Sequence, residues 1–330
     1  MSSITDKYVV LVNAAGALFR SDRTTRLCYA IYEQMFDQEA TMASDGDQLR
    51  LPLETAAPAP PEQIGPSSVE YSPARSILTA SSGFIDSFDF TLNPYSGCTF
   101  GCSYCYAAAF VRDQERREHW GQWVRVKENA LELLRKQRRK PLDGAAIYLS
   151  SVTDPYQPIE RKLRLTRAIL EELVTYHRVR LVVQTRSPLV TRDLALLGRF
   201  TAVRVNMTVT TDDEAVRKVF EPGCASIERR LQAIAQVQQA GVATCITLTP
   251  LLPIADPAGF AERLKATGVE RFVTQYLHAE RGQFVAGTRA AAVALCRERG
   301  WNEAAYRRTV DVLRAALPHL DEGRDGFVPM

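Results

Sequence analysis

The chain has 330 residues, of which 46% are hydrophobic and 24% are charged, and its formal net charge at pH 7 is +3. This length is enough for a globular protein with a large core, and one α/β barrel would use most of it. The charge is too small to indicate a nucleic-acid partner, although it does not exclude one. No stretch approaches the roughly 18 consecutive apolar residues of a membrane span, and the first residues do not resemble a secretory signal. We therefore expect a cytoplasmic protein without a membrane partner.

The first 68 residues are expected to form an extension that is distinct from the rest of the chain. Residues 24–40 place apolar side chains at helical spacing, which predicts a short amphipathic helix. Residues 51–68 are rich in proline and small residues and are typical of a semi-extended linker. We place the main boundary after Ser68, so that residues 69–330 form the principal domain.

The principal domain alternates strand-like and helix-like segments. Six apolar runs rich in β-branched residues are expected to be strands, at residues 88–93, 145–151, 180–185, 202–210, 242–250 and 271–277. Amphipathic segments are expected to be helices, at residues 128–137, 161–177, 189–199, 226–241, 257–268, 288–299 and 303–316. This alternation predicts α/β architecture with a parallel sheet, curled into a barrel or a doubly wound layer, and a helical C-terminal tail. In either arrangement the functional groups gather at the carboxyl ends of the strands.

Three of the seven cysteines, Cys98, Cys102 and Cys105, lie close together in the loop after the first of these strands, within "NPYSGCTFGCSYCYA". An odd number of cysteines in a protein of this size favours metal or redox chemistry over disulfides. Three thiolates at this spacing can hold one soft metal centre and leave a coordination position open. A structural zinc site would need a fourth protein ligand. The nearest histidine is His119, and no fourth cysteine lies close in the sequence.

The C-x3-C-x2-C spacing directly after the first strand, with Tyr104 before the third cysteine, resembles the radical S-adenosylmethionine (SAM) superfamily. The resemblance implies a partial (β/α)6 barrel with an N-terminal extension. It also implies that the three cysteines hold a [4Fe–4S] cluster whose fourth iron binds the amino and carboxylate groups of SAM. An electron donor such as flavodoxin or ferredoxin would reduce the cluster. Reductive cleavage of SAM would then yield a 5′-deoxyadenosyl radical that abstracts hydrogen from a substrate.

Longer segments are similar to one branch of that superfamily, the spore photoproduct lyases and their relatives. The similarity extends over about residues 71–280 and is clearest at residues 76–107, 150–173, 184–197 and 220–234. It implies lyase-like chemistry and keeps a nucleic-acid substrate among the alternatives. The first 65 and the last 30 residues are not explained by it.

The resemblance also implies which side chains contact SAM. At the end of the second strand, the methionine end of SAM would be bound by one or more of Ser150, Ser151, Thr153 and Asp154. After the third strand, Arg186 stands where photoproduct lyases carry a lysine directed at the cofactor carboxylate, and an arginine can make that contact in bidentate form. On the fourth strand, one of Thr208 and Thr210 would face the ribose. The alternative is that these are ordinary polar loops and a surface arginine.

The candidate catalytic residues are two tyrosines and a cysteine. Tyr104 and Tyr106 match the tyrosines that flank the third cluster cysteine in photoproduct lyases. Ser151 occupies the place of the cysteine that returns a hydrogen atom to the substrate radical in those enzymes, and a serine O–H bond is too strong for that step. Cys224 is then the candidate thiol near the rim, whereas Cys245 is expected to pack in the core.

Other polar residues have sufficient local explanations and are weaker candidates. Glu221 and Arg229 belong to a turn and a helix capped by Ser226, and either residue could line the pocket. On the sixth strand the candidates for substrate contact are Gln275, Tyr276 and His278. The basic run at residues 135–140 follows a helix, so a helix terminus competes with a phosphate contact.

Three functions follow from these patterns. The main hypothesis is a radical SAM enzyme with an unidentified substrate. A related hypothesis is a DNA-repair enzyme similar to the photoproduct lyases. A third is a non-catalytic module that binds zinc or a cluster. The cofactor-like loops on the second and third strands count against the third hypothesis.

Overall fold

The computed structural model describes residues 59–277 and 289–330. The chain divides after Pro58 into two units, and the second unit contains all of the described residues. The helix expected at residues 24–40 lies outside the described residues, as does His278. Within the described part of the chain, none of the helices combines the length and the apolar character needed to cross a membrane.

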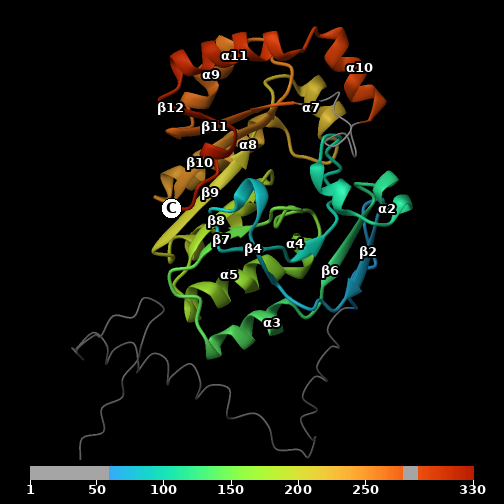
Figure 1. Cartoon of the computed structure of the whole chain (residues 1–330), viewed down its shortest axis with the longest axis vertical. Helices are drawn as coiled ribbons and strands as arrows, with labels where there is room; N and C mark the ends of the chain where they lie inside the picture. Colours follow the sequence, from blue (N-terminus) through green and yellow to red (C-terminus); the bar gives the residue numbers. More distant parts are fainter. Residues whose placement is uncertain (1–58, 278–288) are drawn as a thin grey trace, which may run out of the picture. The chain divides into compact units, whose positions relative to one another are not determined.

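The largest element of the fold is an eight-stranded sheet that curves into a partial barrel (Figure 1). The six predicted strands are confirmed as β4 (Phe90–Leu92), β7 (Ala146–Leu149), β8 (Arg180–Thr185), β9 (Ala202–Thr208), β10 (Ala243–Leu251) and β11 (Arg271–Tyr276). They are parallel and lie side by side in sequence order. Two strands that were not predicted extend the edges: β3 (Leu78–Ala80) is antiparallel to β4, and β12 (His319–Glu322) is parallel to β11. Because β3 and β12 do not pair with each other, the barrel is open.

Most predicted helices form where their apolar spacing placed them. They are α3 (Ala130–Lys136), α5 (Leu165–Tyr176), α8 (Ile227–Gln239), α9 (Pro257–Lys265), α10 (Ala290–Glu298) and α11 (Glu303–Ala316). The long helix expected at 161–177 is interrupted at Arg164, whose φ of 53° separates α4 (Glu160–Leu163) from α5. The helix expected at 189–199 is instead a 3-10 turn, η4 (Pro188–Asp193), followed by the short α6 (Leu194–Leu197).

Two short helices were not predicted. They are α2 (Gln114–Glu118) and α7 (Glu214–Phe220), and an aspartate caps the N-terminus of each. The remaining 3-10 turns are η1 (Gly83–Ile85), η2 (Tyr106–Phe110), η3 (Gln137–Arg139) and η5 (Gly323–Gly326). All of these elements are shorter than the window over which apolar periodicity is informative.

A small second sheet leads into the cysteine loop. Its strands, in spatial order, are β1 (Gln63–Ile64), β2 (Ser67–Ser72), β6 (Trp123–Lys127) and β5 (Tyr95–Ser96). The predicted boundary after Ser68 falls inside β2, and the second compact unit begins at Ala59. Parallel pairing of β2 with β6, from Ser68 opposite Trp123 to Ser72 opposite Lys127, joins this segment to the second unit.

The large sheet is buried on both faces, as expected for parallel strands. On one face, side chains such as Ile147, Val183 and Met207 pack with those of the surrounding helices in the largest core cluster. On the opposite face, Tyr148, Val182, Cys245 and Val273 pack with Phe327 from the C-terminal segment in a separate cluster. The C-terminal segment therefore covers part of the inner face of the sheet.

The packing of Phe327 against the inner face of the sheet can be tested by substitution. Phe327 is 6% exposed, and Phe327→Ala should lower the free energy of unfolding by about 3 kcal/mol, because a buried ring leaves a cavity. The measurement is urea denaturation followed by circular dichroism. Phe110→Ala is the matched control, since Phe110 is 69% exposed, and it should change the stability little. Equal effects of the two substitutions would contradict the packing described here.

Candidate functional site

The cysteine loop is a tight turn whose glycines cannot be replaced without strain. Gly97 has a φ of 75°, and a Cβ at that position would lie 2.6 Å from the Trp123 ring. Within the loop, Gly101 N–H donates to the Cys98 carbonyl at 3.3 Å, and Cys105 N–H donates to the Cys102 carbonyl at 3.1 Å. The backbone thus brings the three predicted cluster cysteines onto one short loop at the carboxyl edge of the sheet.

The three thiols differ in their surroundings. Burial raises the pKa of the Cys98 thiol well above its usual value and that of Cys105 to about 11. The pKa of Cys102 is lowered, because the S–H of Cys224 can donate to its sulfur and the Arg186 cation lies nearby. Of the three thiols, Cys102 therefore loses its proton most readily. A bound metal would be needed to displace the protons of the other two thiols.

The loop fits a soft metal centre by the chemistry of its donors. Among the described residues, no three His, Cys, Asp or Glu side chains are arranged as a metal-binding group, so the thiols must turn toward a common point to share a cluster. Three cysteine thiolates on one loop are the donor set that iron–sulfur clusters take. His119 makes a different contact, since its Nδ1 lies 2.8 Å from the Glu115 carbonyl at the end of α2. The predicted cluster site is therefore compatible with the residues present.

A turn after α7 clasps the cysteine loop through two backbone hydrogen bonds. Ser103 N–H donates to the Phe220 carbonyl at 2.8 Å, and Gly223 N–H donates to the Phe100 carbonyl at 3.0 Å. The approach is so close that a Cβ on Gly223 would lie 2.6 Å from the Thr99 carbonyl oxygen. Glycine is thus required here for close contact between two backbones, in addition to the local turn that the sequence indicates.

Glu221, in the same turn, is the centre of a buried polar network. It is fully buried, and its carboxylate lies 2.7 Å from the equally buried Arg230 on α8. The hydroxyl groups of Tyr104 and Thr210 donate to the same carboxylate, and Arg186 Nε lies 3.6 Å from it. Burial alone would raise the pKa of Glu221, but the cations Arg230 and Arg186 hold it below its usual value. The carboxylate therefore remains ionised inside the protein.

This network fixes the position of Arg186, the predicted partner of the cofactor carboxylate. Its Nη2 donates to the Tyr104 hydroxyl at 3.3 Å, and its backbone N–H donates to Asp154 at 2.7 Å. Its buried Nε has no hydrogen-bond partner among the described residues. Arg186 is thus a half-buried cation at the end of β8, and its Nε lies 3.6 Å from the Glu221 carboxylate.

Asp154 has its carboxylate occupied by protein donors. One oxygen accepts from the Tyr156 N–H at 2.9 Å and from the Thr185 hydroxyl at 2.8 Å, while the other accepts from the Arg186 N–H. Burial raises the pKa of Asp154, although these hydrogen bonds oppose the shift. The contacts give Asp154 a structural task, which is to hold the start of the Arg186 loop against the β7 loop.

The two serines after β7 differ in availability. Ser150 has a φ of 74°, and its buried hydroxyl has no hydrogen-bond partner among the described residues. The Ser151 hydroxyl accepts from Asn93 at 3.3 Å, and its carbonyl accepts from the Tyr106 hydroxyl. Of this pair, Ser150 therefore carries the free polar group, and Ser151 anchors Tyr106.

Thr153 joins the β7 loop to the cysteine loop. Its hydroxyl donates to the Gly97 carbonyl at 2.7 Å and accepts from Gln157 at 3.1 Å. Gln157 in turn accepts from the Thr99 N–H at 3.1 Å. These contacts were not predicted, and they show Thr153 and Gln157 holding the cysteine loop at Gly97 and Thr99.

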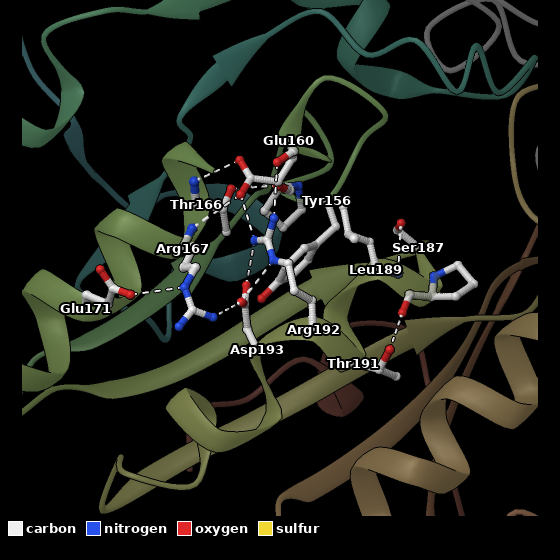
Figure 2. Close-up of polar contacts among 12 residues, drawn as sticks. Tyr156, Glu160, Thr166, Arg167, Glu171, Ser187, Leu189, Thr191, Arg192 and Asp193 are labelled. Atoms are coloured by element: carbon white, nitrogen blue, oxygen red, sulfur yellow. Dashed lines mark hydrogen bonds and ion pairs between the residues drawn. The ribbon is translucent and has the colours of Figure 1, made fainter. Parts of the chain in front are cut away.

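An ionic network behind the β7 loop supports it (Figure 2). The buried carboxylates of Glu160 and Asp193 lie 2.8 Å and 2.7 Å from Nη2 of Arg192. Glu160 also accepts from the Thr166 N–H, and the Thr166 hydroxyl donates to the Pro155 carbonyl. Because Pro155 follows Asp154 directly, this network fixes the loop from the outside of the barrel.

Of the two threonines expected near the ribose, Thr208 is the last residue of β9, and Thr210 lies two positions beyond the strand. Thr208 accepts from Gln184 at 2.7 Å and contacts the Thr247 hydroxyl at 2.9 Å. Thr210 donates to Glu221. The prediction that Thr208 contacts the ribose is not tested by these bonds.

Several weaker candidates lie elsewhere. Arg229 is exposed, whereas its neighbour Arg230 is the buried residue that sequence reasoning missed. Helical periodicity in the sequence indicated this burial, because Arg230 follows Ile227 by three positions and so belongs to the apolar face of α8. Tyr276 packs against Tyr306 of α11, with ring centroids 5.2 Å apart, and so faces away from the inner side.

The Glu221 network generates a second test. Arg230→Ala should lower the free energy of unfolding by about 3 to 5 kcal/mol, because it leaves the Glu221 charge buried without its partner. Arg229→Ala, one position earlier on the same helix, should have little effect. Urea denaturation of the purified chain measures both. A small effect for Arg230→Ala would mean that Glu221 is not ionised or not buried.

Curated relatives share parts of this chain. An uncharacterized protein of Methanocaldococcus jannaschii is 35% identical over 164 residues, covering 50% of this chain and 61% of the relative. An uncharacterized protein of Mycobacterium tuberculosis is 28% identical over 212 residues, covering 60% and 62%. A radical SAM Nα-GlyT isomerase of Pseudomonas phage M6 is 27% identical over 191 residues, covering 56% and 39%. The chain thus spans less than two thirds of the length of each of these relatives.

Solved structures of spore photoproduct lyase variants share the fold. One aligns with a TM-score of 0.57 at 14% identity, covering 89% of this chain and 93% of the lyase. Another, described with a dinucleoside spore photoproduct, aligns with a TM-score of 0.54 at 14% identity. At this level of identity, the likeness concerns the fold alone.

A family model described as the radical SAM superfamily matches residues 92–265, which is more than half of the chain. The matched region runs from β4 to α9 and includes the cysteine loop, the β7 loop, Arg186 and the Glu221 turn. The chain therefore belongs to the radical SAM superfamily.

Proposed function

We propose that this protein is a radical SAM enzyme that binds a [4Fe–4S] cluster and abstracts hydrogen from a substrate that is not yet identified. The observation that carries the proposal is the cysteine loop itself, which presents Cys98, Cys102 and Cys105 at the carboxyl edge of the partial barrel. Two separate segments hold this loop, through Thr153 on one side and Gly223 on the other. A loop held in this way keeps the three cysteines on one short segment, from which their thiols can turn toward a shared centre.

Residues of two neighbouring strands supply groups suited to SAM. The Arg186 guanidinium is a half-buried cation suited to a carboxylate, and the Ser150 hydroxyl is a free polar group at the end of β7. When bound, the cluster and SAM supply the electron and the 5′-deoxyadenosyl radical. The chain orients the cofactor, with Asp154 setting the backbone of Arg186. Binding of the ribose by Thr208, and roles for Ser151 and Thr153 beyond their loop contacts, remain predictions.

The two tyrosines take different parts in this proposal. Tyr104 is buried and bonded to Glu221 and Arg186, so it acts by holding the carboxylate-binding cation. Tyr106 is 47% exposed, with its hydroxyl held by the Ser151 carbonyl, so it is the tyrosine that can meet a substrate. We expect reduction by a small electron carrier such as flavodoxin or ferredoxin.

The first functional test is cofactor cleavage. The protein is purified without oxygen, reconstituted with iron and sulfide, reduced with dithionite and mixed with SAM, and 5′-deoxyadenosine is measured over time. The wild-type protein should form product, while Cys102→Ala should remain at background because the cluster loses a ligand. Cys245→Ala is the matched control, since this buried thiol belongs to the apolar cluster around Phe327 and should leave cleavage intact. Absence of product from wild type, together with stoichiometric zinc, would overturn the proposal.

A nucleic-acid substrate is the second candidate. Its support is the contact of the exposed Tyr106 with Ser151, the residue that the sequence resemblance aligns with the hydrogen-donating cysteine of photoproduct lyases. The basic run at 135–140 supports it little, because Lys136 is paired with Glu132 and Arg138 with Glu172. The substrate site, rather than that run, would have to recognise the nucleic acid.

Ultraviolet-irradiated DNA tests this second candidate. If the chain is a photoproduct lyase with an altered hydrogen donor, Ser151→Cys should increase repair relative to wild type, because a thiol gives up its hydrogen more readily than a hydroxyl. Photoproduct content is measured by mass spectrometry after digestion. Ser150→Cys is the neighbouring control. Unchanged photoproduct in every variant, during continued formation of 5′-deoxyadenosine, would exclude this substrate while leaving the main proposal in place.

A further inference from the structure

Cys224 lies against one of the predicted cluster ligands. Its sulfur is 3.9 Å from the Cys102 sulfur, although the two residues are 122 positions apart in the chain. Both side chains are buried. Sequence spacing offered no fourth cysteine for the loop, and the fold brings one to it.

The position of the Cys224 sulfur is set by backbone contacts of the turn that carries it. The Cys224 N–H donates to the Glu221 carbonyl at 3.1 Å, and the Cys224 carbonyl accepts from Arg217 at 3.0 Å. Arg217 also donates to the Glu221 carbonyl at 3.1 Å, and its Nε is paired with Glu214 at 2.5 Å. The turn is therefore held as a unit, and it is clasped to the cysteine loop through Gly223.

We propose that Cys224 is a positioning residue for the cluster: its S–H donates a hydrogen bond to the Cys102 sulfur and makes the cluster easier to reduce. This inference rests on the proposed cluster at Cys98, Cys102 and Cys105. A metal-bound thiolate has lone pairs but no proton, so Cys102 can only accept, and the proton of the pair must reside on Cys224.

The direction of the effect follows from charge. Reduction adds negative charge to the cluster and its thiolates, and a donated hydrogen bond stabilises the more negative state. Hydrogen bonds to the sulfurs are among the features that set the reduction potential of such clusters. The S–H of Cys224 should therefore raise the midpoint potential and ease delivery of the first electron.

This role differs from that of a hydrogen-atom donor to the substrate, which the sequence suggested for Cys224. A donor to the substrate must reach the substrate radical, whereas the Cys224 sulfur is buried against Cys102. The two roles predict different defects. Loss of a substrate donor would leave the cluster potential unchanged, and loss of a cluster hydrogen bond would shift it without any substrate present.

The test is a redox titration of the reconstituted cluster, followed by electron paramagnetic resonance, without SAM or substrate. Cys224→Ala and Cys224→Val both remove the donor, and valine also fills the space if alanine impairs folding. Each should shift the midpoint potential to a more negative value. Cys224→Ser, which keeps a hydroxyl donor, should restore part of the shift, and Cys245→Ala should match wild type. Iron and sulfide per chain should be equal in all five proteins.

Two outcomes would overturn the inference. Unchanged midpoint potentials at full cluster content would show that the Cys224 thiol donates no hydrogen bond that matters to the cluster. Selective loss of iron from the Cys224 variants, with iron retained in Cys245→Ala, would show that Cys224 is itself a ligand. Failure of the wild-type protein to hold any cluster would instead refute the proposed function, so the two failures are distinguishable.

Discussion

A buried carboxylate, Glu221, determines how the site is assembled. An ionised carboxylate inside a protein is costly unless its charge is balanced and its oxygens accept hydrogen bonds. Here Arg230 balances the charge, and the hydroxyl groups of Tyr104 and Thr210 donate to one of the oxygens. These three partners come from α8, the cysteine loop and the end of β9. The contacts of this one carboxylate therefore bring three separate parts of the chain together beside Arg186.

The cysteine loop depends on this assembly. It makes few hydrogen bonds within itself and is held from outside by the Glu221 turn on one side and by Thr153 and Gln157 on the other. Such external support is typical of functional sites whose geometry must not relax, because supporting contacts hold the reactive groups in place. The β7 loop has its own support in the network of Glu160, Arg192 and Asp193. The site is thus built from short loops, each fixed by buried charge.

Much of the fold could be predicted from the sequence, because its physical signal is local. Six runs of buried β-branched residues and the amphipathic helices between them appear where expected, and parallel strands connected by helices lie in sequence order. The missed elements include β1, β12 and α7, although β12 is as long as β7 and α7 is as long as α3, which were both predicted. The pairing of β2 with β6 was not predicted, because its register depends on a partner about 55 residues away.

The sequence by itself determined the parallel α/β architecture and the family. A cysteine spacing and strand-like composition are properties of adjacent residues, and they indicate chemistry without any knowledge of packing. Only the tertiary structure decided which polar residues meet. It selected Arg230 over Arg229, brought Thr210 to Glu221, occupied Asp154 with protein donors and brought Cys224 to Cys102. The reason is that contacts between distant segments depend on how the strands and loops pack in three dimensions, which no local sequence pattern indicates.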